Sequence, residues 1–126
     1  MILGLGMDLA EISRIEKAIQ KEHFLERIYS ETEREWIKKQ GAQTAAGFFA
    51  AKEAVAKALG TGFSGFGPWD IEVDKDAFGA PQVRLHGKAL ERCKAMGGRR
   101  MLLTITHESG FAAATVILTD EGEECV

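Results

Sequence analysis

An alanine-rich segment between Thr44 and Gly60 constrains the fold of this chain more than any other stretch. Seven of the positions from Ala45 to Ala58 are alanine, the residue with the highest intrinsic helix propensity. Thr44 can cap the start of such a helix, and Gly60 can end it in the left-handed conformation. The segment therefore predicts a long, slim helix that other elements can approach closely.

Three charged side chains, Lys52, Glu53 and Lys57, interrupt this apolar helix, and packing does not require them. Lys57 follows Glu53 by four residues, so the two side chains project from the same side of the helix. On spacing alone they are either a surface salt bridge of roughly 0.2–0.5 kcal/mol or part of a ligand site. Lys52 lies about a quarter turn away and can reach the same ligand or only solvent.

Residues 1–9 alternate with a period of two, which predicts a strand. Leu3, Leu5, Met7 and Leu9 share one face, and the opposite face is nearly bare because it carries Ile2, Gly4, Gly6 and Asp8. Glycines on one face of a strand permit close approach of another backbone. If the slim helix packs on this face, Asp8 comes near Glu53.

Two carboxylates beside a glycine-rich loop are a plausible oxygen site for Mg²⁺. This ion typically takes one or two carboxylates and completes its octahedron with water and phosphate oxygens. Asp8 has an alternative role, because Asp8-Leu9-Ala10-Glu11 also fits a capping-box-like start to a first helix. The two roles are not exclusive.

The remaining pattern predicts one α+β domain over residues 1–126, with a small antiparallel sheet packed against the long central helix. Helical spacing covers residues 11–39, and Ser30 with Glu33 resembles a capping box. A glycine-rich loop then leads to short strands at 69–73 and 82–85 and a helix at 87–96. Residues 101–106 and 111–119 predict a hairpin that turns at Ser109-Gly110.

Composition excludes several function classes. The net charge of −3 argues against a protein that binds nucleic acid by whole-surface attraction. No apolar run approaches the roughly 18 residues that a membrane helix requires, and no charged-then-apolar signal segment opens the chain. Cys93 and Cys125 are too few for a disulfide framework or a zinc site. We therefore expect a soluble cytoplasmic protein.

Two further features have ordinary structural explanations beside functional ones. The loop with Gly60, Thr61 and Gly62 follows its helix, so the positive end of the helix dipole does not face it and it is not a P-loop. Any phosphate there must be held by backbone N–H groups, lysines and metal. His107 ends a predicted strand, where a histidine is more often structural than catalytic.

Taken together, these segments closely resemble the holo-[acyl-carrier-protein] synthases, the single-domain 4′-phosphopantetheinyl transferases. The match runs in order through nearly the whole chain. It rests on Gly4-Leu5-Gly6-Met7-Asp8-Leu9 with Arg14, on Phe49-Ala50-Ala51-Lys52-Glu53-Ala54 with Lys57-Ala58 and Gly60-Thr61-Gly62, and on Ile105-Thr106-His107 and Ala112-Ala113-Ala114-Thr115-Val116.

The resemblance implies transfer of 4′-phosphopantetheine from coenzyme A to a serine of apo acyl carrier protein, in support of fatty acid biosynthesis. The other product is adenosine 3′,5′-bisphosphate. Asp8 and Glu53 would be the Mg²⁺ ligands, and Lys57 would contact phosphate and could also assist proton transfer as a catalytic residue. Lys52 could also neutralise phosphate. His107 and the loop of Gly60, Thr61 and Gly62 would line the coenzyme A site. The general base stays open between Glu53, Asp8 and a metal-bound water.

The resemblance also implies partners. Carrier proteins are acidic, and Arg14 matches the family's docking arginine; Lys17, Lys21 and Arg27 either extend this basic patch or belong to a solvated helix face. A single copy of the fold implies a homotrimer with sites between subunits. One departure is Phe48, which stands where many relatives carry arginine; if that arginine contacts phosphate or carrier protein, this protein must supply the charge elsewhere.

Two rival functions use the same residues differently. A metal-dependent phosphohydrolase or nucleotide-binding enzyme would turn over nucleotides without any carrier protein. A non-catalytic oligomeric binding module would use Glu53 and Lys57 only as a structural pair.

Overall fold

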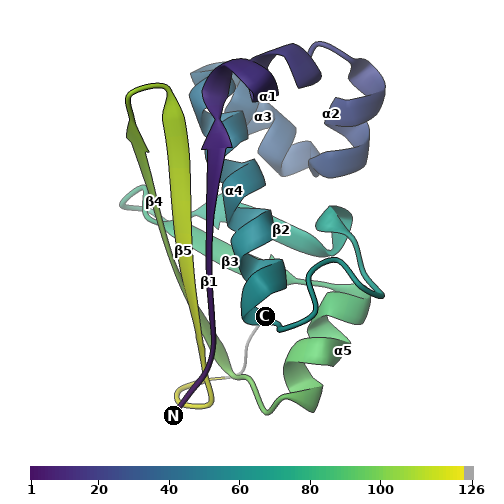
Figure 1. The fold of residues 1–126 in the computed structure, drawn as a ribbon, viewed down its shortest axis with the longest axis vertical. Helices are drawn as coiled ribbons and strands as arrows, with labels where there is room; N and C mark the ends of the chain where they lie inside the picture. The colour runs from purple at the N-terminus through teal and green to yellow at the C-terminus, as the bar shows by residue number, and fades with distance from the viewer. Residues whose placement is uncertain (124–126) are drawn as a thin grey trace.

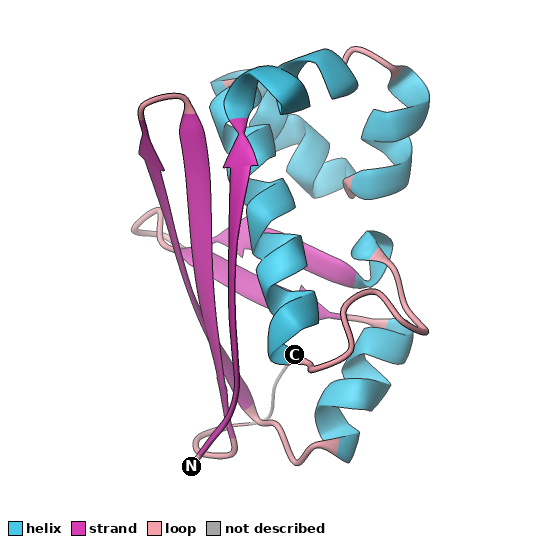
Figure 2. Cartoon of the chain, viewed as in Figure 1, coloured by secondary structure: helices cyan, strands magenta, loops and turns pink. Residues whose placement is uncertain are grey.

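The long helix α4 (Ala42–Ala58) runs through the centre of the computed structural model, which describes residues 1–123 and therefore not Cys125. A three-stranded antiparallel sheet covers one side of α4, and the four shorter helices of the described residues and a two-stranded hairpin lie around the rest (Figure 1). The predicted α+β class, with a small antiparallel sheet against a long central helix, is confirmed. Figure 2 separates the sheet from the helices by colour.

The three-stranded sheet has the order β1-β5-β4. Its strands are β1 (Ile2–Glu11), β4 (Arg100–Glu108) and β5 (Phe111–Thr119). The predicted hairpin of β4 and β5 is confirmed, and it turns through Ser109 and Gly110, which both have positive φ. In the β1–β5 register Gly6 lies opposite Val116, and Asp8 lies opposite Ala114.

Strand β1 packs on α4 through its glycine face, as the sequence predicts. A Cβ built on Gly4 would lie 2.0 Å from the Ala58 carbonyl oxygen, and one built on Gly6 would lie 1.8 Å from the Ala54 carbonyl oxygen. Any larger residue would therefore push the strand away from the helix. The contact fixes Asp8, two residues further along the same face, beside α4.

Two predicted helix starts are wrong. Strand β1 continues through Asp8 to Glu11, so Asp8 does not begin α1 (Ile12–Ala18). The N-cap of α4 is Gly41, with φ of 85°, whereas Thr44 lies inside the helix. Glycine accepts this backbone conformation without the steric cost that a Cβ brings, and α4 consequently starts earlier than Thr44. Gly60, with φ of 80°, follows the helix end as predicted.

The other elements surround α4. They are α2 (Glu22–Ile28), α3 (Glu31–Gln40), the 3₁₀ turn η1 (Pro68–Asp70), β2 (Ile71–Lys75), β3 (Pro81–Leu85) and α5 (Gly87–Ala95). The capping box of Ser30 and Glu33 is present at the start of α3. Strand β2 starts two residues later than predicted because η1 occupies that position. No helix within residues 1–123 is long and apolar enough to cross a membrane.

Candidate functional site

Asp8 and Lys57 meet where β1 crosses α4. The Lys57 ammonium lies 3.2 Å from Asp8 Oδ1 and donates to the Met7 carbonyl oxygen at 2.9 Å. The Asp8 side chain is 20% exposed and the Lys57 side chain 52%. The pair therefore lies at the surface, where a ligand can reach it. The sequence pairs Lys57 with Glu53, but the salt bridge in the structure is to Asp8.

Glu53 lies one helical turn before Lys57 and is half-buried. Burial raises the pKa of its carboxyl group, and the negative charge of Asp8 raises it further. The positive charges of Lys57 and Arg14 offset part of this increase in the pKa. Three separate elements, β1, α1 and α4, thus bring these four charged side chains together.

The two carboxylates fit a divalent cation that binds oxygen. Within residues 1–123, no side chain makes an ion pair or a hydrogen bond with Glu53, and no group of three or more His, Cys, Asp or Glu side chains gathers. Zinc sites in proteins normally use more protein ligands than this. Mg²⁺, in contrast, is held by one or two carboxylates together with water and substrate phosphates.

Lys52 points in the opposite direction, into the core. Its ammonium lies 3.0 Å from Glu33 Oε1 and donates to the carbonyl oxygens of Pro68 and Ile71. Burial lowers the pKa of Lys52, and Glu33 offsets part of the decrease. All three N–H groups of the ammonium therefore have protein acceptors. This corrects the expectation that Lys52 faces phosphate.

The loop after α4 uses two of its amides to close the helix. Gly60 N–H donates to the Lys57 carbonyl at 2.9 Å, and Gly62 N–H donates to the Ala56 carbonyl at 3.2 Å. The Thr61 hydroxyl bonds to the Gly62 carbonyl. The loop is thus held next to Lys57, but these two amides are occupied and are not open to phosphate.

Arg92 is a cation at this loop that the sequence pattern does not reveal. Its Nε donates to the Leu59 carbonyl at 2.9 Å, and its Nη2 lies 3.5 Å from the position of a Cβ built on Gly60. A guanidinium near the C-terminal end of a helix is favourable because the helix dipole is negative there. No spacing rule links α5 to the end of α4, so only the fold shows this contact.

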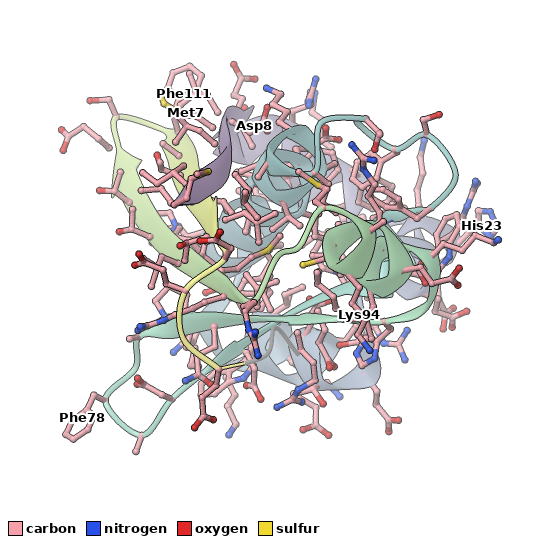
Figure 3. The ribbon with its side chains drawn as sticks, turned by 90° about the horizontal axis from the view of Figure 1, so that it is seen from below. Met7, Asp8, His23, Phe78, Lys94 and Phe111 are labelled. Atoms are coloured by element: carbon pink, nitrogen blue, oxygen red, sulfur yellow. The ribbon has the colours of Figure 1, made fainter. Side chains whose placement is uncertain are left out.

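His107 is not brought to the carboxylates. It lies on β4, which β5 separates from β1, and its Nε2 is 3.0 Å from the Gln43 carbonyl oxygen near the start of α4. A small cavity of about 150 Å³ contacts His107, Phe48 and Lys75. The cavity also contacts Gly79, next to Phe78 at the turn between β2 and β3. Figure 3 shows Phe78 across the molecule from Asp8.

Phe48 is 2% exposed and belongs to the hydrophobic core. The position therefore contributes no charge at the surface. Lys75 of β2 contacts the same cavity, and its ammonium lies close to Gln40 Oε1 and 4.8 Å from the centre of the Trp36 ring. Lys75 thus places a positive charge beside the cavity that Phe48 also lines.

A second cavity, of about 440 Å³, opens beside Glu53. Aromatic and aliphatic side chains form most of its wall, and the guanidinium of Arg27 stands at it. Its lining includes Phe24, Phe49, Phe63, Phe66 and Trp69. The exposed Arg14, Lys17 and Lys21 lie on α1 and just before α2, the side of the molecule from which Arg27 also comes. Of the predicted basic residues, Arg14 and Arg27 therefore lie near Glu53, and neither makes an ion pair with it.

Comparison with known proteins agrees with this geometry. A family model described as the 4′-phosphopantetheinyl transferase superfamily matches residues 4–116. The chain is 46% identical over 121 residues to a holo-[acyl-carrier-protein] synthase of Treponema denticola, covering 94% of this chain and 98% of the relative.

Solved structures show the same fold. The holo-[acyl-carrier-protein] synthase of Helicobacter pylori in complex with coenzyme A superposes with a TM-score of 0.81 at 35% identity, over 91% of this chain and 99% of that chain. The Bacillus anthracis enzyme, in complex with coenzyme A (3′,5′-ADP), gives a TM-score of 0.78 at 37% identity, over 94% and 96% of the two chains.

Proposed function

This chain belongs to the 4′-phosphopantetheinyl transferase superfamily, and we propose that it transfers 4′-phosphopantetheine from coenzyme A to a serine of apo acyl carrier protein. The observation that carries the proposal is the close packing of β1, which carries Asp8, on α4, which carries Glu53, so that the charge of Asp8 raises the pKa of Glu53. Lys57 stands beside both, and relatives of known structure bind coenzyme A. We assign the whole chain, residues 1–126, to one catalytic domain that acts in the cytoplasm in fatty acid biosynthesis.

In this proposal Asp8 and Glu53 hold Mg²⁺. When bound, the ion would supply positive charge that offsets the negative charge of the coenzyme A phosphates. Lys57 adds a positive charge on the same side, and its half-exposed ammonium can donate to a phosphate oxygen while keeping its bond to Asp8. The Gly60–Gly62 loop keeps the end of α4, and hence Lys57, in place.

The nucleophile is the serine hydroxyl of the carrier protein. Its oxygen bonds to the phosphorus that carries the pantetheine arm, the bond from this phosphorus to the leaving adenosine 3′,5′-bisphosphate breaks, and the serine proton is transferred to a base. Asp8 Oδ1 already accepts from Lys57. Within residues 1–123 Glu53 accepts no such bond, so a carboxylate oxygen that does not hold the cation is available to the serine proton. We therefore assign the proton to the Glu53 carboxylate.

Carrier proteins are acidic, so a basic docking surface beside Glu53 fits the transfer. Arg14 lies close enough to lower the pKa of Glu53, and Arg27 contacts the cavity next to it. Lys17 and Lys21 are exposed, on α1 and just before α2. Such charges steer association and make its rate depend on ionic strength.

The proposal includes a homotrimer. The outer face of the sheet is apolar and uncovered, with Leu5, Met7 and Leu9 exposed at 66%, 61% and 58%. Exposed apolar surface of this kind typically marks a protein interface, and a closed ring of three copies would cover it. Assembly would also explain why His107 and the carboxylates lie apart in one chain, since a site between subunits takes them from different copies.

One experiment tests the reaction directly. The protein is mixed with apo carrier protein, coenzyme A and Mg²⁺, and the carrier protein is weighed by mass spectrometry. We expect its mass to rise by one phosphopantetheine arm. An unchanged mass would refute the proposal. A parallel reaction without carrier protein separates the rivals, because a phosphohydrolase would still consume coenzyme A there.

A further inference from the structure

Lys52 and Glu33 form an ion pair inside the protein, next to the site but outside the chemistry assigned to it. Their side chains are 2% and 0% exposed, and Lys52 Nζ lies 3.0 Å from Glu33 Oε1. Lys52 also donates to the carbonyl oxygens of Pro68, at 3.0 Å, and of Ile71. A buried charge is tolerated when it is paired and hydrogen-bonded in this way.

Glu33 completes the network from α3. Its Oε1 accepts from Ser30 N–H at 2.7 Å, and its Oε2 accepts from Val73 N–H at 2.7 Å. No buried side-chain nitrogen or oxygen within residues 1–123 lacks a hydrogen-bond partner. A single ion pair thus joins the start of α3, the middle of α4, η1 and β2.

This network holds one wall of the 440 Å³ cavity beside Glu53. The cavity is lined by Lys52 and Glu53 together, and by the segment Gly67–Trp69 that Lys52 holds at the Pro68 carbonyl. The preceding loop contains Gly60, Gly62 and Gly65, all with positive φ. Glycine-rich loops have high conformational freedom, so the loop alone does not hold Gly67–Trp69 in place. The bonds of Lys52 determine the position of this segment.

Stability alone does not account for this pair. Apolar side chains of similar volume commonly replace a buried ion pair without loss of stability. Lys52 and Glu53 are neighbours on α4. The buried ammonium of Lys52 therefore holds the cavity wall from the same helical turn that presents the Glu53 carboxylate to the ligand.

We propose that Lys52 is a positioning residue, which holds the Gly67–Trp69 wall against α4 so that the cavity beside Glu53 accepts an alkyl or amide group of the substrate. The inference rests on the proposed function. The aromatic lining fits such a group, whose source is either the pantetheine arm of coenzyme A or an apolar side chain of the carrier protein.

The test uses the double variant Lys52→Met/Glu33→Gln, which removes both charges and keeps similar side-chain shapes. Lys52→Met alone would leave Glu33 buried without its cation and is expected to unfold. Leu118→Ala, a buried change in β5 far along the chain from the network, controls for general loss of stability. Both proteins are studied well below their melting temperatures.

The first measurement is amide hydrogen exchange over residues 60–70, which needs no activity. We expect exchange at least tenfold faster in the double variant and within twofold of wild type in Leu118→Ala. Unchanged exchange in the double variant would show that Lys52 does not hold the wall and would overturn the inference.

The second measurement is steady-state kinetics with both substrates. We expect KM to rise at least fivefold for one substrate with kcat within threefold of wild type. A rise for coenzyme A assigns the cavity to the pantetheine arm, and a rise for carrier protein assigns it to that protein. Both KM values within twofold would overturn the positioning role. If wild type itself transfers nothing, the proposed function fails, while hydrogen exchange still decides whether Lys52 holds the wall.

Discussion

Gly6 of β1 faces Ala54 of α4 so closely that a Cβ on Gly6 would lie 1.8 Å from the Ala54 carbonyl oxygen. This contact sets the distance between the strand that carries Asp8 and the helix that carries Glu53. The separation of the two carboxylates therefore depends on a residue that contacts neither of them.

Gly6→Ala should destabilise the protein and separate Asp8 from Glu53. We expect its free energy of unfolding to fall by about 3 kcal/mol, the upper end of the range usual for overpacking, because the added methyl group meets backbone atoms. Gly97→Ala is the control, because Gly97 has a positive φ of 80°, which Gly6 does not have, and no atom within 4 Å of its Cβ position, so only the backbone cost of roughly 1–2 kcal/mol applies there. Urea unfolding measures the free energy of unfolding of both variants. Equal losses would contradict the close-packing argument.

Glu53→Gln should abolish transfer and raise the melting temperature at neutral pH without Mg²⁺. The pKa of Glu53 is raised above its ordinary value of 4.5, so the folded state holds this proton more tightly than the unfolded state. Wild type therefore loses stability as pH rises from about 4.5 through the raised pKa, and the variant does not.

Differential scanning fluorimetry between pH 4 and pH 8 checks this dependence. The difference in melting temperature between Glu53→Gln and wild type should grow with pH and then level off. Mg²⁺ should raise the melting temperature of wild type, since an ion bound only by the folded state stabilises it, and should have less effect on the variant. A variant that is less stable at neutral pH would contradict the assignment.

Lys57→Met should lower kcat/KM for coenzyme A by roughly 10- to 100-fold, the loss expected for one hydrogen bond to a charged group. Because Lys57 is half-exposed and its salt bridge lies at the surface, the free energy of unfolding should change by less than about 1 kcal/mol. Lys57→Arg retains the charge and should recover part of the activity. A large loss of stability in Lys57→Met would instead indicate a structural role.

Arg14→Ala should raise KM for carrier protein by about fivefold and leave KM for coenzyme A unchanged, as expected for a charge that guides docking. The effect should shrink in high salt, where such charges are screened. Lys88→Ala, an exposed lysine on α5, is the matched control and should change neither constant. Equal increases in both KM values for Arg14→Ala would remove the docking assignment.

Asp8→Ala and His107→Ala should each be inactive alone and partly active when the two proteins are refolded together. If each site takes Asp8 from one subunit and His107 from another, random mixing in a ring leaves about a quarter of the sites intact. Transfer activity of the mixture, measured against each variant refolded separately, checks this. No recovery would place both residues in the same subunit's site or exclude His107 from it.

Local sequence patterns predicted much of the site because each pattern carries its own physical constraint. The glycine face of residues 2–8 and the alanines of α4 allowed only a close strand–helix contact, and Asp8 and Glu53 follow from it. The β4–β5 hairpin and the Ser30–Glu33 capping box were likewise predictable, since alternation and capping act over a few residues.

The orientation of the lysines was not predictable in the same way. Helix α4 is buried on most of its circumference, so it has no clear polar face from which to decide whether Lys52 or Lys57 points outward. Lys52 turns inward because Glu33 and the Pro68 and Ile71 carbonyls, which come from three other elements, provide its acceptors. Arg92 likewise bonds to the Leu59 carbonyl only because the folded chain brings α5 to the end of α4.

The sequence by itself thus determined the elements, the α+β class and the approach of Asp8 to Glu53. Only the tertiary structure decided that Lys57 pairs with Asp8, that Lys52 supports a cavity wall, and that His107 stands apart from the carboxylates. The physical reason is range: propensity, alternation and capping act between residues near in sequence, whereas a buried charge finds its partners only when distant segments pack together.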